Sequence, residues 1–547
     1  MRRSPAGTLA LATLTGLLAL LCACEQPGPV DTPGPSDSGT EPSPPAPQLL
    51  LQLTSPTASV QQGAQHEVRV QVTRAGGWSG DVSLSLESPP AGLSAEPLTV
   101  PAGVNEGTWR ILAAPTAPVG GPFTLLVTAR SEALGLESRS HLQLTVVRPP
   151  PGALDPTFGA RGVLEVEMPC DDVELLAARR GDGKVVVATL SFAPGCFQPE
   201  LMRFNPEGTP DTTFGTGGRM PISLFRMPDA LAVEPEGKSL LASAWYLQRR
   251  LANGQLDSSF GKSGEVDFSK VRLATSFIHA LHALGDGSSL VAGTTSSCDS
   301  LGNNCLTSCT DCDVPLLSRL LADGSLDTSF GQSGFVSVTL PGDSVIRALH
   351  VQSDGKILAA GFTTRPMETD VFVARFLAQG GLDTSFNGSG VRSVRWGAVS
   401  PLEGLELVRQ PDGKVVVLAT RDADFGLLRL DGAGNLDAAL GTNGFVTTSV
   451  GGTDGAYALA LQAEGRLVAA GYSYTPEGRP YPLLLRYLDN GTLDETFGEA
   501  GVARPTLGQR VNSLRWLDAS RDGRLLGLGV WRQAGQKGRL VVGRFLQ

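Results

Sequence analysis

One six-residue pattern, Leu-Asp-x-x-Phe-Gly, recurs through the last four hundred or so of the 547 residues of this chain. The aspartates at its second position are Asp155, Asp211, Asp257, Asp327, Asp383, Asp437 and Asp494. Successive aspartates are 56, 46, 70, 56, 54 and 57 residues apart, and 53 residues follow the last one. Self-similarity at such a period indicates a repeat architecture, in which each repeat is one structural unit that packs on the next.

Each repeat contains signals for four short strands. A strand follows the motif, as at 162–166 and 334–338, and a second, rich in Ala and Leu, ends at a tight turn. That turn is Asp-Gly in five repeats and Glu-Gly in the other two, and Asp-Gly between apolar runs is a strong hairpin signal. An aliphatic strand and a strand with an arginine complete the unit. Four strands in about 55 residues predict one blade of a β-propeller, and seven blades would close a ring over 152–547.

The Leu-Asp-x-x-Phe-Gly and Asp-Gly-Lys motifs resemble those of the delta-60 repeat family of bacterial extracytoplasmic proteins. The resemblance covers the chain beyond residue 150, with Pro210 in place of the first Leu, Leu440 in place of Phe and Asn387 in place of Gly. It implies a propeller-like fold and an extracytoplasmic location. The family has no catalytic motif that could be transferred, so the resemblance implies no reaction.

An arginine stands eight residues before each motif aspartate from the second onward. The pairs are Arg203/Asp211, Arg249/Asp257, Arg319/Asp327, Arg375/Asp383, Arg429/Asp437 and Arg486/Asp494. Arg544 has no aspartate after it and Asp155 has no arginine before it, so a closed ring would complete the set with this pair. Guanidinium and carboxylate form strong paired hydrogen bonds, which predicts a structural clasp at the blade edges. The alternative is a ring of aspartates that binds cations at a pore mouth, although pairing with arginine would make these carboxylates poor metal ligands.

The N-terminus has the layout of a secretory signal. Arg2 and Arg3 precede an apolar run that ends at Ala23 and is too short to be a permanent membrane span. The run ends Leu-Cys-Ala-Cys, which resembles the lipobox of bacterial lipoproteins and implies removal of residues 1–23 and acylation of Cys24. An ordinary signal peptide is the alternative. Glu25 after the cysteine favours the outer membrane, so we expect an extracytoplasmic, lipid-anchored protein.

Two further segments precede the repeats. Residues 24–47 are rich in proline and lack apolar periodicity, which predicts an extended tether. Residues 48–148 contain short runs of alternating apolar and polar residues separated by turn clusters, which is typical of one immunoglobulin-like β-sandwich. We therefore predict an all-β chain: a sandwich, a stiff junction at Pro149–Pro151, and a seven-bladed propeller.

Six cysteines lie beyond the lipobox: Cys170, Cys196, Cys298, Cys305, Cys309 and Cys312. An even number in an exported chain predicts disulfides, with Cys170 bonded to Cys196 and the other four paired among themselves. Those four lie in an insert at 296–313 that lengthens the third repeat, and four thiolates could instead hold zinc. Long loops on a rigid scaffold often carry recognition, so this insert is a candidate interaction surface.

Two histidines occupy equivalent positions, since His282 and His350 each stand four residues before an Asp-Gly turn. A metal or acid–base pair is one interpretation, and packed positions in the wall of the ring are the interpretation we favour. His279 and His282 are three residues apart, so a regular strand would place them on opposite faces and prevent joint metal ligation.

The net charge of −10 and the lack of a Lys/Arg-rich run argue against nucleic acid or anionic lipid as the main partner. No nucleophile elbow, phosphate loop or acid–base pair of carboxylates is recognisable, so we assign no catalytic residue, metal or cofactor. The leading hypothesis is a non-catalytic, monomeric lipoprotein whose propeller binds a glycan or protein, or acts as a scaffold. The alternative is a glycan hydrolase or lyase with its site in the channel, which aromatic and carboxylate residues there would favour.

Overall fold

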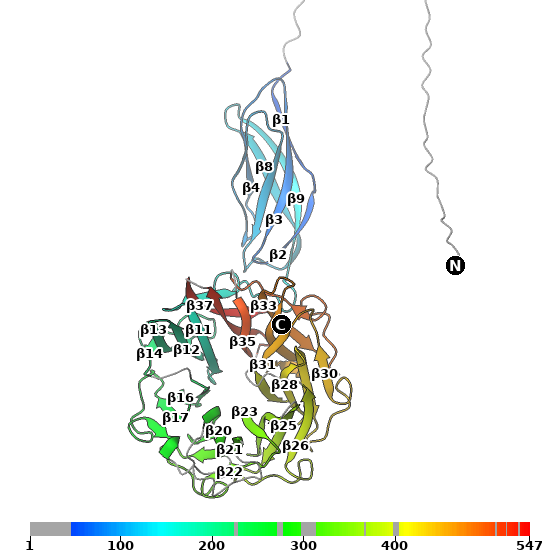
Figure 1. The fold of residues 1–547 in the computed structure, drawn as a ribbon. Helices are drawn as coiled ribbons and strands as arrows, with labels where there is room; N and C mark the ends of the chain where they lie inside the picture. Colours follow the sequence, from blue (N-terminus) through cyan, green and yellow to red (C-terminus); the bar gives the residue numbers. More distant parts are fainter. Residues whose placement is uncertain are drawn as a thin grey trace, which may run out of the picture.

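The computed structural model describes residues 45–223, 228–270, 277–296, 313–365, 368–397, 404–508, 511–520, 522–533 and 536–547. Cys24, the signal segment and most of the tether lie outside these residues. The described chain is all-β, with two short 3-10 turns at Phe268–Lys270 and Ala463–Gly465. Figure 1 shows a small β-sandwich beside a ring of sheets. None of the described residues belongs to a helix long and apolar enough to cross a lipid bilayer.

The sandwich consists of two sheets. One has the strand order β1 (Gln48–Leu53), β3 (Gln65–Ala75), β7 (Glu106–Ala113), β5 (Leu93–Ala95). The other has the order β2 (Thr57–Gln61), β9 (Leu136–Val147), β8 (Gly120–Ser131), β4 (Val82–Glu87), β6 (Leu98–Val100). Strand β2 runs parallel to β9, and the other pairs are antiparallel.

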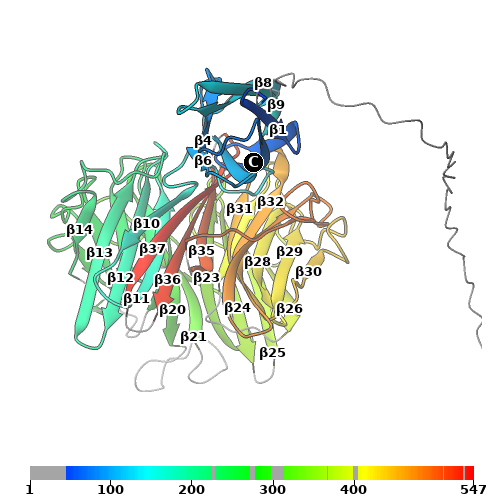
Figure 2. The same ribbon diagram turned by 90° about the horizontal axis from the view of Figure 1, so that it is seen from above.

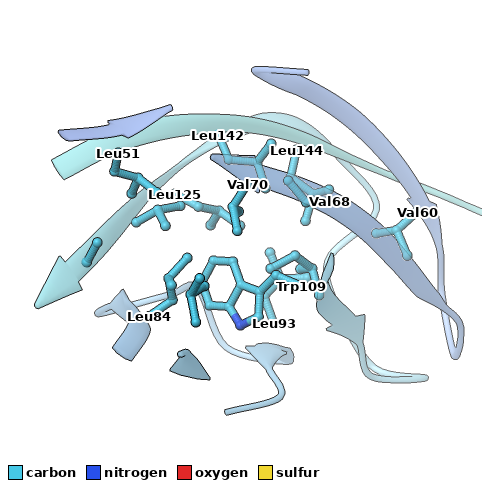
Figure 3. Packing of buried hydrophobic residues seen from close by; sticks show 14 of the residues in the cluster. Leu51, Val60, Val68, Val70, Leu84, Leu93, Trp109, Leu125, Leu142 and Leu144 are labelled. Atoms are coloured by element: carbon cyan, nitrogen blue, oxygen red, sulfur yellow. The ribbon is translucent and has the colours of Figure 1, made fainter. Parts of the chain in front are cut away.

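Alternation along the strands builds the sandwich core. In β3, Val68, Val70 and Val72 are buried while the residues between them are exposed, as a half-buried strand requires. Trp109 lies between the two sheets, near Leu84 and Leu93 (Figure 3), and its indole nitrogen donates a hydrogen bond to the Glu96 carbonyl over 2.7 Å. A buried tryptophan with a satisfied N–H contributes a large apolar area without an unpaired polar group.

Beyond residue 160 the described strands form seven antiparallel sheets of four strands each. From the inner to the outer strand, the first three are β11 (Asp172–Arg179), β12 (Val185–Ala193), β13 (Cys196–Phe204), β14 (Arg219–Pro221); β15 (Ala230–Val233), β16 (Ser239–Ser243), β17 (Tyr246–Arg250), β18 (Glu265–Asp267); and β19 (Phe277–Ala283), β20 (Ser289–Ser296), β21 (Asp313–Leu320), β22 (Phe335–Ser337).

The next three sheets are β23 (Asp343–Val351), β24 (Ile357–Arg365), β25 (Glu368–Phe376), β26 (Val391–Gly397); β27 (Leu405–Arg409), β28 (Val415–Arg421), β29 (Asp424–Leu430), β30 (Phe445–Thr448); and β31 (Asp454–Leu461), β32 (Leu467–Tyr474), β33 (Pro480–Tyr487), β34 (Val502–Ala503). In each sheet the outermost strand is the one that follows the next Leu-Asp-x-x-Phe-Gly motif. The sheets are therefore shifted by one strand relative to the sequence repeat.

This shift determines how the two ends of the ring meet. Strands β35 (Val511–Ala519), β36 (Leu525–Gln533) and β37 (Gln536–Phe545) come from the end of the chain, and their fourth strand is β10 (Val163–Glu167). The pairing of β10 with β37 runs from Val163 opposite Gly543 to Glu167 opposite Arg539. The last sheet thus takes its outer strand from the first repeat, which pairs what would otherwise be two exposed sheet edges.

The ring has two faces, which we name by their turns. Each innermost strand begins at what we call the entry face and ends at the Asp-Gly or Glu-Gly turn on the opposite side, which we call the turn face. Figure 2 shows the ring from the side. The sandwich contacts the ring at the first motif, since a Cβ atom on Gly63 would lie 2.4 Å from Cβ of Pro156.

Motif phenylalanines pack between neighbouring sheets, against a glycine in the turn that precedes the next motif. A Cβ atom on Gly254 would lie 2.8 Å from the Phe214 ring, so only glycine fits there. Gly152 meets Phe497 at the same distance, and the Gly498 N–H donates to the Pro151 carbonyl over 2.8 Å. The predicted junction at Pro149–Pro151 is therefore also the first turn of the ring.

A disulfide joins Cys170 to Cys196, with the two Cα atoms 6.0 Å apart. It links the segment before β11 to the first residue of β13 within one sheet, as predicted. Cys298, Cys305, Cys309 and Cys312 lie outside the described residues.

Candidate binding site on the inner strands

All seven Arg–Asp pairs are hydrogen-bonded, and we call them the clasps. In each, the arginine Nε lies 2.6–2.9 Å from the aspartate Oδ2, and the seventh pair joins Arg544 to Asp155 over 2.9 Å across the ends of the ring. Each arginine that has a motif phenylalanine also lies over its ring, with 4.4–5.1 Å from the guanidinium carbon to the ring centroid. Several arginines donate in addition to a carbonyl of the next repeat, as Arg375 does to Gly432 over 2.6 Å. The clasps therefore connect neighbouring sheets.

The other aspartate oxygen is occupied as well. In Asp383 it accepts hydrogen bonds from the backbone N–H and the hydroxyl of Ser385, over 3.1 and 2.6 Å. The lysine of the Asp-Gly-Lys turn adds a second cation, as Lys356 does to Asp383 over 2.9 Å. Burial acts to raise the pKa of this carboxyl, but these donors outweigh it and hold the pKa well below its usual range. The pKa is lowered in all seven clasp aspartates. Protein donors surround each charge, as a structural role requires.

Four of the innermost strands contain a β-bulge at the same place. The extra residues are His279 in β19, Arg347 in β23, Tyr457 in β31 and Arg515 in β35, each seven residues before the acidic residue of its turn. Each is half-buried, whereas the residue before it is buried. A bulge redirects one side chain without ending the strand, and bulges are frequent beside functional sites.

A glycine on the neighbouring strand makes room for each bulge. These glycines are Gly293, Gly361, Gly471 and Gly529, each seven residues after the acidic turn residue. A Cβ atom on Gly361 would lie 1.8 Å from the Val345 carbonyl oxygen, which excludes every other residue. Thr189 and Ala419 hold this position in β12 and β28, and the pairing of those strands with β11 and β27 is regular. Sequence analysis missed the bulges, although these glycines signal them.

The bulged side chains reach groups from other sheets. The Arg515 guanidinium carbon lies 4.9 Å from the centroid of the Tyr457 ring, which is one sheet away. Burial lowers the pKa of Arg347, and the Asp229 carboxylate, which comes from a sheet two places away, partly offsets this. Asp229 also accepts a hydrogen bond from the Ala244 N–H over 2.7 Å. The inner strands therefore bring groups that are distant in sequence together in two pairs, Arg515 with Tyr457 and Arg347 with Asp229.

A second layer of polar residues lies nearer the turn face. His282 and His350 come from neighbouring sheets, and burial lowers both pKa values, with His350 adding to the effect on His282 and Arg409 adding to that on His350. Arg179 pairs with Asp518 over 2.6 Å. The two histidines thus occupy the inner wall. The predicted placement of His279 and His282 on opposite faces assumed a regular strand. That assumption was wrong, because His279 is the bulged residue of β19.

Glu406 on β27 stands apart from this layer. Burial raises its pKa to about 7, and no cation among the described residues offsets the effect. Near neutral pH this carboxyl can therefore carry a proton, and in that form it donates as well as accepts hydrogen bonds.

Aromatic side chains flank the bulges at the entry face. Trp245, in the turn between β16 and β17, lies 6.0 Å from Phe277, measured between ring centroids, and the two residues are 37% and 39% exposed. The Ile278 N–H donates to the Ala244 carbonyl over 2.8 Å, which fixes this pair next to His279. On the far sheets, Tyr472 lies 5.5 Å from both Tyr457 and Tyr474. We define the entry-face site as Asp229, Trp245, Phe277, His279, Arg347, Tyr457 and Arg515.

Five segments of the chain match the family model described as "Domain of unknown function (DUF5122) beta-propeller". They are residues 180–214, 313–330, 352–386, 410–439 and 462–497. Four of them end at a motif phenylalanine, so the matches contain the clasp arginine and aspartate. These matches support the predicted β-propeller repeat family over the five segments, while the resemblance to delta-60 repeats stays a prediction.

A search of curated proteins gives no match. Solved structures with a similar arrangement include a protein of unknown function from Bacteroides caccae, at 14% identity and a TM-score of 0.31, with 56% of this chain and 94% of that one covered. A polysaccharide lyase has 14% identity and a TM-score of 0.41 over 70% of this chain and 91% of its own. A gluconolactonase from Xanthomonas campestris has 12% identity and a TM-score of 0.32 over 70% and 97%.

Proposed function

We propose that this chain is a non-catalytic binding protein, exported and lipid-anchored at Cys24, whose seven sheets are the blades of a closed seven-bladed propeller. The sandwich, an immunoglobulin-like module in this proposal, acts as a spacer between the tether and the ring. The ligand binds at the entry-face site. One observation carries the binding role: the repeats keep the same clasp residues but differ at the bulge position.

The clasp positions and the bulge positions differ in how much their side chains vary from one repeat to the next. The clasps repeat the same arginine and aspartate throughout the ring, as a frame requires. The bulge position holds in turn an imidazole, a guanidinium, a phenol and another guanidinium. A residue needed only for packing has no reason to vary in this way between equivalent sheets. Varied polar groups on a rigid scaffold are the usual composition of a recognition site.

The arrangement of the parts also suits display of a ligand site. The sandwich meets the ring at Pro156, in the first motif, whereas Trp245 and Phe277 lie where the innermost strands begin. A tether at the start of the sandwich would therefore leave the entry-face site open to the surroundings.

Anchoring is tested by the change Cys24→Ser. We expect the variant to lose labelling by fatty acid and to leave the membrane fraction, or to accumulate with its signal segment uncleaved. A Cys22→Ser variant is the matched control, because that cysteine lies in the signal segment and should not affect anchoring. Membrane association and labelling that are the same in both variants would contradict the proposal.

Binding is tested with the full-length protein on an array of glycans and peptides, followed by analysis of the bound glycans for cleavage. We expect retention of intact ligand, and loss of that retention in an Arg515→Gln variant. Retention that is unaffected by changes in the entry-face site would contradict the proposed binding role.

Glu406 favours one alternative to a non-catalytic binding protein, namely an enzyme that acts on glycans. A carboxyl with a pKa of about 7 in the inner wall suits a general acid or base, which is the property expected of a glycan hydrolase or lyase. Cleaved products in the array experiment that disappear in Glu406→Gln would support this enzymatic function.

A further inference from the structure

We infer that the ligand of the entry-face site is an uncharged oligosaccharide. The inference rests on the proposed binding function and adds the chemical class of the ligand. It follows from three properties of the site: exposed aromatic rings, a mixture of hydrogen-bond donors and acceptors, and a carboxylate that offsets one of its two guanidinium charges.

The aromatic rings provide flat apolar surfaces at the edge of polar groups. Trp245 and Phe277 are fixed against each other and are more than a third exposed, which is uncommon for large aromatic side chains in a folded domain. A sugar ring has an apolar face of C–H groups and a rim of hydroxyls. It can pack its face on the Trp245 indole with its hydroxyls directed toward the bulged His279, which follows Phe277 by two residues on β19.

The polar groups supply both partners that a hydroxyl requires. Arg347 and Arg515 can only donate hydrogen bonds, Asp229 can only accept them when ionised, and His279 and Tyr457 can do both. A hydroxyl is both a donor and an acceptor, so a ligand with many hydroxyls matches this set better than one with acceptors alone.

The charges argue against an anionic ligand. The Asp229 carboxylate acts electrostatically on Arg347 and offsets one of the two guanidinium charges, while Arg515 lies over the Tyr457 ring and keeps its charge. The whole chain has a net charge of −10. A polyanion such as a sulfated or uronic-acid glycan would bind best to a strongly basic surface, whereas among the seven residues that define the entry-face site the arginines exceed the carboxylates by only one.

The test measures binding of full-length protein to three immobilised sets: neutral oligosaccharides, uronic-acid or sulfated oligosaccharides, and peptides. We expect retention on neutral oligosaccharides with little dependence on salt between 50 and 500 mM, roughly the range over which screening removes charge attraction. Trp245→Ala and Arg515→Gln should each weaken binding about ten-fold or more, as for residues at the centre of a binding site. Leu321→Ala, which changes an exposed apolar residue next to a turn outside the site, should leave binding unchanged.

Each other result overturns the inference in a recognisable way. Retention only on acidic glycans or peptides, lost in Arg515→Gln, would refute the neutral ligand but keep the proposed binding function. Retention on none of the sets, or retention that Trp245→Ala and Arg515→Gln do not change, would refute both. Circular dichroism and the melting temperature of each variant show whether a loss of binding comes from unfolding.

Discussion

One clasp lacks a hydroxyl that most of the others have. In Arg375 and Arg486 the Nη2 atom donates to a serine or threonine hydroxyl, Ser385 over 3.0 Å and Thr496 over 3.1 Å. The equivalent residue beside Arg429 is Ala439, and the Nη2 atom of Arg429 is buried without a hydrogen-bond partner. A buried donor left unpaired costs about 1–3 kcal/mol.

We therefore predict that Ala439→Ser stabilises the protein. The new hydroxyl would accept from Arg429 and donate to Asp437, raising the free energy of unfolding by about 1 kcal/mol. Urea denaturation measures this change. Ala438→Ser, at the adjacent exposed position, is the matched control, and equal effects of the two changes would show that the missing hydroxyl is not the cause.

Glu406 gives the protein a pH dependence opposite in sign to that of the clasps. Its pKa in the folded state, about 7, is above the usual value of 4.5. The stability it contributes is therefore complete below about pH 4.5 and is lost as the pH rises through 7. We predict that Glu406→Gln melts at a higher temperature than the unmodified protein at pH 8 and at a similar temperature at pH 5. Glu236→Gln, at an exposed turn, is the control and should change the melting temperature equally little at both pH values. A change in melting temperature of Glu406→Gln that is the same at pH 5 and pH 8 would refute a raised pKa of Glu406 as its cause.

At the scale of the strands, each bulge on an innermost strand depends on the glycine opposite it on the neighbouring strand. Its test is Gly361→Ala, because the added Cβ would collide with the Val345 carbonyl. We expect a loss of about 2–4 kcal/mol in unfolding free energy, typical of a buried steric conflict. Ala419→Gly, at the same position of an unbulged strand, should cost only about 1 kcal/mol through backbone entropy. Comparable losses in the two variants would show that glycine is not required by the bulge.

The strands of the ring and the clasps could largely be predicted from the sequence. The motif period, the Asp-Gly turns and the Arg–Asp spacing are local patterns, so strands such as β24 and β28 and all seven pairs were identifiable. The pairing of β10 with β37 followed only from assuming that the ring closes. The short sandwich strands β2, β5 and β6 could not be predicted individually, because three to five residues give too little alternation to detect.

The entry-face site was harder to predict for a physical reason. Its residues come from separate repeats, and it is the packing of sheets around the ring, which no local sequence pattern records, that brings Tyr457 near Arg515 and lets Asp229 act on Arg347. The assumption of regular strands also hid the four bulged residues. A comparison of the repeats at the position of Gly361 would have revealed them, since that glycine is present only where the strand register shifts.

For the whole molecule, the clasp between Arg544 and Asp155 should be as important as one inside the ring. We predict that Arg544→Ala lowers the free energy of unfolding about as much as Arg375→Ala, by roughly 3 kcal/mol. Asp155 would stay buried with only Arg524 as a cation, at 3.3 Å, just as Asp383 would keep only Lys356. Lys537→Ala is the control on the same strand. Lys537 pairs with Glu167, both side chains are 59% exposed, and loss of such a surface pair costs little. Denaturation curves of the three variants make the comparison, and an Arg544→Ala variant as stable as Lys537→Ala would contradict a closed ring.

The pairing of β10 with β37 also sets the order in which the chain can finish folding. Ribosomes make the outer strand of the last sheet first, and its partner Gly543 follows 380 residues behind Val163. At typical synthesis rates of about 5–20 residues per second, β10 waits on the order of half a minute for its neighbour. During that interval both ends of the growing array are open sheet edges that can pair with another chain. A chain interrupted before β37 would keep those edges, so the ten residues of this strand decide whether the molecule is protected from aggregation.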